Sequence, residues 1–153
     1  MPHIFQINIS EKGGKPKLPI VDGFVTTNGI QGDKQARPDK HGGVDKALSL
    51  FSLEKSLEIQ KAGIAMFVGG MGENFSIAEM DWQTIEVGDK FLIGDELQIE
   101  ITADSGPCKL IAQYYHENNN HDIDEATFNG WKRFYAKVIE EGYIRTGDGI
   151  VKQ

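Results

Sequence analysis

The glycines of this chain set the main constraint on its fold, because 18 of them are spread among short apolar runs. The clearest pair of runs is 90–93 and 96–102, joined by a Gly-Asp pair, and apolar and polar residues alternate along 96–102. Alternation puts apolar side chains on one face of a strand, and glycine supplies the turns. The pattern predicts many short strands joined by tight turns, as in a small β-barrel or sandwich.

Similar runs predict the remaining strands, and one segment predicts a helix. Ser52 is a typical N-cap, and Gly63 is a plausible stop about ten residues later. A second, shorter helix is expected over 110–115, while 30–45 and 116–124 are expected to be polar loops. The expected strands are 3–10, 24–27, 47–51, 75–77, 90–93, 96–102, 135–139, 143–144 and 150–151.

Length and charge limit the possible partners. A chain of 153 residues without a composition break is expected to form a single domain over 1–153. Its net charge of −7 argues against nucleic acid as a partner. The first residues lack the features of a signal peptide, and no apolar run approaches membrane length. We therefore expect a cytoplasmic protein with no membrane partner.

Cys108 is the single cysteine, so it cannot form an internal disulfide, and it is the residue most expected to carry chemistry. Pro107 suits the first turn of a helix. Cys108 would then lie near free backbone N–H groups, and Lys109 would add a cation beside it. Both features favour the thiolate, which is the nucleophile and the metal ligand. The alternative is a buried structural cysteine, which burial statistics favour.

Three other segments could bind a ligand. The glycine pair after His41 lets backbone approach a ligand closely, and the glycine-rich stretch 69–74 could form an anion nest. Arg37 and Arg133 carry forks that suit phosphate or carboxylate. The alternatives are a solvated loop, a plain turn and ordinary surface cations. A metal site made from His116, His121, Asp122 and Asp124 matches no zinc spacing, so an exposed loop is favoured there.

Four blocks, in order along nearly the whole chain, share one resemblance. They are Gly32-Asp33 with His41-Gly42-Gly43-Val44-Asp45-Lys46-Ala47-Leu48, then Gly72-Glu73-Asn74-Phe75, then Val87-Gly88-Asp89 and Ile93-Gly94 leading to Pro107-Cys108-Lys109, then Ala136-Lys137-Val138 with Gly142 and Gly147-Asp148. Together they resemble the MOSC family, named after the C-terminal part of molybdenum cofactor sulfurase. This implies a mostly β fold, a small closed or partly open barrel like the pyruvate kinase barrel domain, with one or two to three short helices.

The resemblance also implies roles. Cys108 would either carry sulfur as a persulfide or bind molybdenum, and the implied cofactor is molybdopterin, bound stably or in passing. The His-Gly-Gly and Gly-Glu-Asn blocks are expected to line the same pocket. The residues expected to bind the cofactor are Lys34, Arg37, His41, Gly42, Gly43, Gly72, Glu73, Asn74, Lys109 and Arg133.

Two departures from the family pattern matter. Asp104 falls where many members carry an arginine, so Arg37 or Arg133 would have to supply the cation. From the 153 residues we also expect neither a desulfurase domain like that of long sulfurases nor an N-terminal barrel domain like that of two-domain members. No lysine has a recognisable pyridoxal phosphate motif, so we expect no such cofactor in this chain, and the sulfur donor would be a separate cysteine desulfurase.

Three functions remain open from the sequence. The first is a sulfur carrier or transfer protein for the molybdenum cofactor, with a persulfide on Cys108. The second is a molybdenum-dependent reductase of N-hydroxylated small molecules, with Cys108 as a soft ligand of the metal. The third is a non-catalytic module that binds the small-molecule or pterin cofactor.

Overall fold

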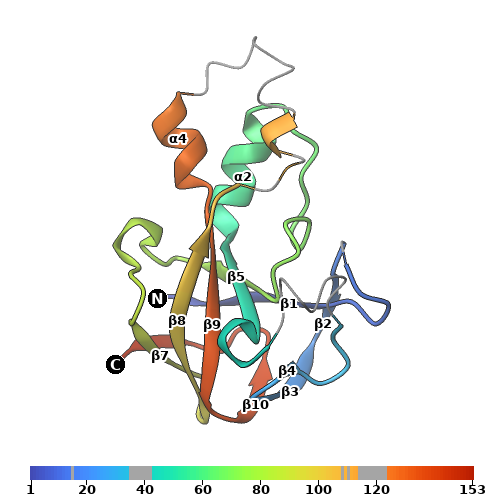
Figure 1. Cartoon of the computed structure of the whole chain (residues 1–153), viewed down its shortest axis with the longest axis vertical. Coiled ribbons are helices and arrows are strands. Elements are labelled where there is room, and N and C mark those ends of the chain that lie inside the picture. Colours follow the sequence, from blue (N-terminus) through green and yellow to red (C-terminus); the bar gives the residue numbers. More distant parts are fainter. Residues whose placement is uncertain (15, 35–42, 108, 110, 114–123) are drawn as a thin grey trace.

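Strands dominate this chain in its computed structural model, which describes residues 1–14, 16–34, 43–107, 109, 111–113 and 124–153 (Figure 1). Among the described residues, strands hold 42% and helices 19%. The predicted mostly β fold with a few short helices is therefore confirmed. No helix among the described residues is long and apolar enough to span a membrane.

The described strands form two sheets. The larger sheet has eight strands in the order β11-β7-β8-β9-β5-β6-β1-β2, and the smaller has the order β10-β3-β4. Their bounds are β1 (His3–Ile9), β2 (Leu18–Ile20), β3 (Asp22–Thr26), β4 (Gly29–Ile30), β5 (Leu48–Ser52), β6 (Phe75–Ala78), β7 (Lys90–Ile93), β8 (Leu97–Ser105), β9 (Arg133–Glu140), β10 (Gly142–Arg145) and β11 (Ile150–Lys152).

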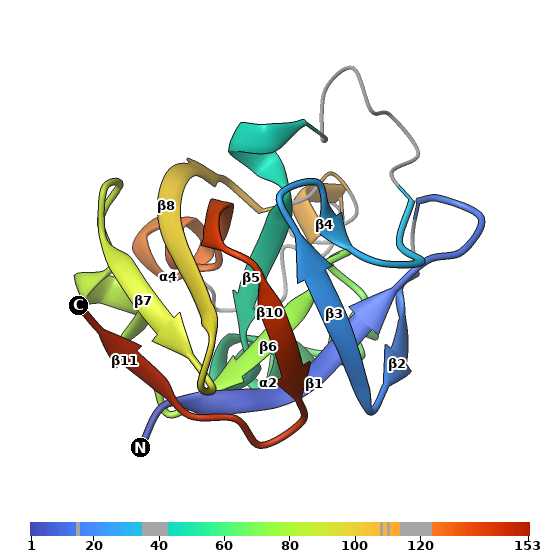
Figure 2. The same ribbon diagram turned by 90° about the horizontal axis from the view of Figure 1, so that it is seen from below.

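The larger sheet curls until strands at its two ends meet. A single bridge pairs His3 of β1 with Gly149, and the Ile4 N–H donates to the Asp148 carbonyl at 2.9 Å. Figure 2 shows β7, β11 and β1 curving around a common interior. Because this junction is one bridge and no continuous ladder, the fold is a partly open barrel.

The helices gather at one end of this barrel (Figure 1). α2 (Leu53–Lys61) crosses between the parallel strands β5 and β6, and the Ser52 side chain caps it by accepting the Lys55 N–H at 3.2 Å. α4 (Glu125–Gly130) leads into β9, and residues 109 and 111–113 are also helical. Two short 3-10 helices are η1 (Val44–Lys46) and η2 (Trp82–Thr84).

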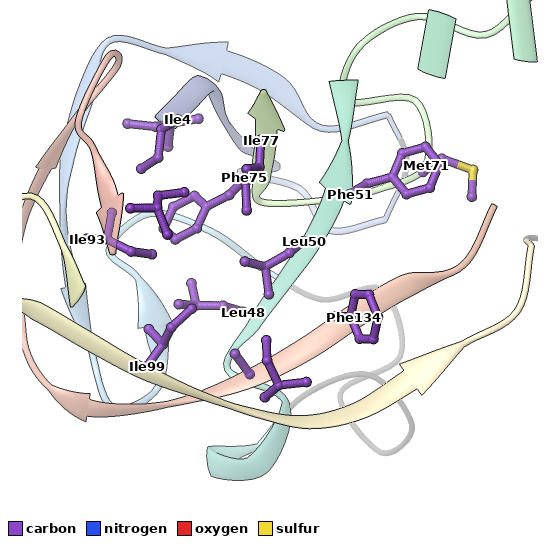
Figure 3. Close-up of a cluster of buried hydrophobic side chains, with 14 of the residues drawn as sticks. Ile4, Leu48, Leu50, Phe51, Met71, Phe75, Ile77, Ile93, Ile99 and Phe134 are labelled. Carbon is purple, nitrogen blue, oxygen red and sulfur yellow. The ribbon is translucent and has the colours of Figure 1, made fainter. Parts of the chain in front are cut away.

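Hydrocarbon side chains fill the barrel interior (Figure 3). Inward residues of neighbouring strands face each other, as Leu50 does Phe75 on one side and Phe134 on the other. The cavity found there is only about 10 Å³, and apolar side chains line it. A volume of that size is at the lower limit for one water molecule. The interior therefore offers no room for a cofactor, and a ligand site must lie outside it.

The expected elements are largely confirmed. Every predicted strand is present, with each end within three residues of the expected position, and the helix after Ser52 stops before Gly63, whose φ is 87°. The sequence did not predict β2, β4 or α4, which are only three, two and six residues long. The 30–45 loop holds β4 and η1 at its two ends.

Candidate functional site

The outer face of β9 is unusual because its polar side chains are buried. Phe134 points into the barrel, so Arg133 and Tyr135 on either side point outward. Both are nevertheless covered, since Arg133 is 8% and Tyr135 5% exposed. An outward-facing arginine on a barrel strand is normally solvated, so other segments of this protein cover this face.

The covered polar face continues across the neighbouring strands. Ser49 lies opposite Tyr135, and Asn74 and Asn8 follow on the β6 and β1 side. All three are buried. We call Arg133, Tyr135, Ser49, Asn74 and Asn8 the polar row. It crosses four adjacent strands of the larger sheet, on the side opposite to the hydrocarbon core.

Asn74 is the centre of this row. Its Oδ1 accepts the Ser49 backbone N–H at 3.0 Å, and its Nδ2 donates to the Asn8 carbonyl at 3.2 Å. The same Nδ2 donates to Asp33 Oδ2 at 2.9 Å. One side chain thus connects β5, β1 and the turn that ends at Asp33.

Asp33 fixes the start of the segment that carries several predicted ligands. Its Oδ1 accepts from Lys17 Nζ at 2.6 Å and from the Ser10 N–H at 2.8 Å, and the Lys17 and Asp33 side chains are only 4% and 6% exposed. The Lys34 N–H donates to the Ser10 carbonyl at 2.8 Å, while the Lys34 side chain is exposed. Lys17 therefore holds Asp33 in place beneath the polar row, although the sequence predicts only a polar turn over 11–17.

The glycine-rich stretch 69–74 packs against Arg133. Arg133 Nη1 donates to the Met71 carbonyl at 2.6 Å, and Glu73 beside it is buried. The N–H groups of Gly70, Gly72 and Asn74 already donate to protein carbonyls at 2.8–3.0 Å. These three donors are therefore used within the fold, which favours a structural turn over the anion nest.

Gly43 brings the end of the His-Gly-Gly block to the same face. Its φ of 89° begins η1, and Lys46 at the end of η1 lies with Nζ 5.0 Å from the centre of the Tyr135 ring. The Thr102 hydroxyl on β8 donates to the Asp45 carbonyl, which holds η1 against the sheet. His41, Gly42 and Arg37 lie outside the described residues.

The strand that leads to Cys108 ends beside Arg133. Ser105, the last residue of β8, pairs directly with Arg133, the first of β9. Cys108 itself lies outside the described residues, while Lys109 is helical and exposed. Asp104 pairs with Lys132 at 3.5 Å, with 54% and 36% of their side chains exposed. The negative charge of Asp104, which departs from the family pattern, is therefore paired with a lysine on the solvent-exposed side.

Arg133 is the buried cation at the β9 end of the polar row. Nη2 donates to the Tyr135 hydroxyl at 3.2 Å, whereas Nε is buried and has no hydrogen-bond partner. In the part of the chain that the structure describes, no carboxylate forms an ion pair with Arg133.

A metal site would require a cluster of side chains that can bind the ion, and no three or more of the described His, Cys, Asp or Glu side chains form such a cluster. Of the proposed metal ligands, Asp124 caps α4, and His116, His121 and Asp122 lie outside the described residues.

The structure thus brings Gly43, Gly72, Glu73, Asn74 and Arg133 onto one face and leaves Lys34 and Lys109 exposed at its edges. Sequence reasoning missed Lys17, Asn8 and Tyr135 as members of this arrangement. Tyr135 could have been found from its spacing of two from Arg133, which puts both on one face of a strand. Nothing in the sequence signals that Lys17 is buried.

Comparison with known proteins identifies relatives over most of the chain. The family model described as MOSC domain matches residues 37–151. The uncharacterized protein YflK of Bacillus subtilis is 26% identical over 90% of this chain and 68% of its own length. Protein YiiM of Escherichia coli is 31% identical over 73% of this chain, and the match spans about half of that protein. A protein named reductase from Gibberella moniliformis is 25% identical, with 23% of its length matched.

Solved structures show the same fold. The crystal structure of YiiM from Geobacillus stearothermophilus matches all of this chain and 75% of its own, with a TM-score of 0.71 and 20% identity. YuaD of B. subtilis matches 98% of this chain and 94% of its own, with a TM-score of 0.70 and 19% identity. At these identities the likeness concerns the fold alone.

Proposed function

The chain belongs to the MOSC domain family, and from that premise we propose that it is a cytoplasmic sulfur carrier for the molybdenum cofactor, with Cys108 holding the sulfur as a persulfide. MOSC domains are associated with molybdenum cofactor enzymes. The observation that carries the proposal is the buried Arg133, which forms no ion pair with a described carboxylate and lies beside Ser105, three residues before Cys108. A cation there would bind an anionic ligand next to the segment that bears the thiol.

The described residues fit the anionic end of such a cofactor. Molybdopterin carries a phosphate, and phosphate binds preferentially to arginine forks. Arg133 Nε is a buried donor that no described residue satisfies, and leaving a buried donor unsatisfied costs about 1–3 kcal/mol. The cofactor, when bound, would supply the metal centre that receives or uses the sulfur. Arg133 would hold its anionic end, and Gly43 and Glu73 would border the same face.

The chemical step assigned to this chain is loading of Cys108. The Cys108 thiolate attacks the terminal sulfur of a persulfide on a separate cysteine desulfurase. A new S–S bond forms at Cys108, the donor's S–S bond breaks, and the donor cysteine leaves as a thiolate, so no external oxidant is needed. The attack requires a deprotonated thiol, which a helix N-terminus and the neighbouring Lys109 favour.

A second function is supported by the relative named reductase. In that function Cys108 is a metal ligand of a molybdenum-dependent enzyme that reduces N-hydroxylated small molecules. Thiolate is a soft ligand and suits such a metal. Both functions use the same cysteine and the same cation, and they differ in whether the metal stays with the protein.

Native protein from a molybdenum-replete host tests the two functions together. Intact-mass spectrometry should find one extra sulfur on the wild type that is absent from Cys108→Ser, with molybdenum well below one atom per chain. Stoichiometric molybdenum that is lost in Cys108→Ser would replace the carrier with the reductase. If neither sulfur nor molybdenum depends on Cys108, both functions are wrong.

A further inference from the structure

Asparagine is followed by glycine at two places in this chain, 28–29 and 129–130. This pair is chemically reactive because the glycine nitrogen can attack the amide carbon of the asparagine side chain, and glycine has no side chain to hinder the approach. A new C–N bond closes a five-membered succinimide ring, the C–N bond of the side-chain amide breaks, and ammonia leaves with the proton of the attacking nitrogen. Water then opens the ring to aspartate or isoaspartate, so the reaction needs no oxidant or cofactor.

The attack requires backbone freedom, because the glycine nitrogen must give up its hydrogen bond and turn toward the asparagine side chain. The free energy of local opening in a folded protein ranges from near zero at frayed ends to the global value in the core. Two pairs of the same composition can therefore react at different rates, and their surroundings in the fold decide which reacts faster.

The pair at 28–29 is held firmly in the turn between β3 and β4. Gly29 pairs with Thr26 across this turn. The Thr26 hydroxyl accepts the Asn28 N–H and donates to the Gly29 carbonyl, both at 3.1 Å. Gly29 is also buried, and a Cβ atom added there would lie 2.7 Å from the Ala47 carbonyl oxygen. The backbone of this turn therefore has little room to move.

The pair at 129–130 lies in a much looser setting, at the end of α4. This helix has six residues, and none of them is buried. Helices shorter than about 12–15 residues are marginal unless tertiary packing supports them, and helix ends fray. Asn129 is exposed, and a Cβ atom added at Gly130 would meet no described atom within 4 Å. This pair therefore has the freedom that 28–29 lacks.

A chemical change at Asn129 would act on the segment that leads into β9. Trp131 follows two positions later, is only 1% exposed, and donates from Nε1 to Glu58 Oε2 of α2 at 3.1 Å (Figure 1). A carboxylate in the last turn of a helix interacts unfavourably with the helix dipole. Isoaspartate also adds one carbon to the backbone just before Trp131. Both changes disturb the contact between α4 and α2.

From these observations we propose that Asn129 is a site of spontaneous deamidation, and that the fold protects Asn28 from the same reaction. The product weakens the attachment of α4 to α2 through Trp131 and lowers the stability of the fold. The inference is independent of the proposed function, because the reaction consumes only water and leaves Cys108 unchanged.

Peptide mapping by mass spectrometry of the full chain, aged at mildly alkaline pH, tests the site, since deamidation replaces an amide by an acid and changes the peptide mass. Asn129 should convert about ten times faster than Asn28, or more, because the two differ in local opening. In guanidinium chloride at a concentration that unfolds the chain, the two should convert at similar rates. Faster conversion of Asn28 in the folded protein, no conversion of Asn129, or a ratio that unfolding leaves unchanged would overturn the inference.

Matched variants test the effect on the fold. Asn129→Gln should stop the conversion at this position, because glutamine must close a larger ring, whereas Asn28→Gln should leave the conversion of Asn129 unchanged. Asn129→Asp carries the acid from the start and should lower the midpoint of urea denaturation. Asn28→Asp makes the same change in an exposed turn and should lower the midpoint by less. Equal shifts for the two aspartate variants would overturn the effect on the contact between α4 and α2.

Discussion

Asp33→Asn offers the sharpest test of how the candidate site is built. Asp33 accepts with both oxygens, Oδ1 from Lys17 and the Ser10 N–H and Oδ2 from the Asn74 amide. Asparagine has almost the same shape but only one oxygen. Whichever way the asparagine amide is placed, its NH₂ group faces a hydrogen-bond donor. The ammonium of Lys17 also loses its counter-charge, although the Lys17 side chain is only 4% exposed.

Removing one partner of a buried ion pair costs about 3–5 kcal/mol, because the other charge is left in the interior. Asp33→Asn should therefore lower the free energy of unfolding by that amount. Urea denaturation followed by circular dichroism measures it, and the midpoint should fall with little change in the m-value. Adding Lys17→Met removes the stranded charge, so the double variant should lose less than the sum of the two single variants.

Asp104→Asn is the matched control, because it makes the same chemical change in an ion pair that is half exposed. Its loss should stay below about 1 kcal/mol. Equal losses for the two variants would refute the claim that the Lys17–Asp33 pair is a buried foundation of the site. An additive double variant would show that the two groups do not interact.

Two further predictions concern the turn and the pH dependence. Gly69 has a φ of +95°, and the Cβ of Gly69→Ala would lie 2.8 Å from the Lys17 carbonyl oxygen, so the variant should lose more free energy of unfolding than the backbone strain of about 1–3 kcal/mol alone. Gly43→Ala is the control, because Gly43 has a similar φ of +89° but no described atom within 4 Å of the added Cβ. Equal losses for the two variants in urea denaturation would contradict the clash at Gly69. The hydrogen bond from the Glu86 N–H lowers the pKa of Asp89 below its ordinary 3.8. Partial burial opposes this shift, and the ammonium of Lys152 adds to it. This stabilisation is full above that value and is lost as pH falls through the lower folded pKa, so Asp89→Asn should flatten the acid limb of the stability curve, and an unchanged limb would contradict it.

The sequence predicts the fold well where the determining contacts are local. The β7–β8 hairpin pairs Ile93 with Leu97 across the Gly-Asp turn, as alternation and turn residues predict. Ser52 and Gly63 mark the ends of α2 because caps act within one helical turn. α4 was missed since a helix of six residues that ends in a glycine gives little periodicity to detect.

The candidate site is less predictable because its parts meet through sheet order. Arg133 and Ser105 are 28 positions apart and become neighbours only when β8 pairs with β9. In the sequence, Lys17 is one cation in a polar turn. Its burial depends on an ion pair with Asp33, which follows 16 positions later, after β3 and β4. The resemblance to the MOSC family predicted that the Gly-Glu-Asn block lines a cofactor pocket. The structure shows in addition that the Asn74 side chain holds β5, β1 and the Asp33 turn together.

The filled barrel explains why the long connections of this chain matter. Apolar side chains occupy the interior, so a cofactor would have to be held outside it, and the outer face of the sheet is where the described polar groups gather. An outer face becomes a binding site when loops cover it and polar groups beneath them stay dry, because a low dielectric strengthens each charge and hydrogen bond. The turns at 31–34, 43–46 and 67–74 supply that cover over β1, β6, β5 and β9. Changes in these turns should therefore alter ligand affinity, whereas conservative changes among the interior residues should alter stability alone.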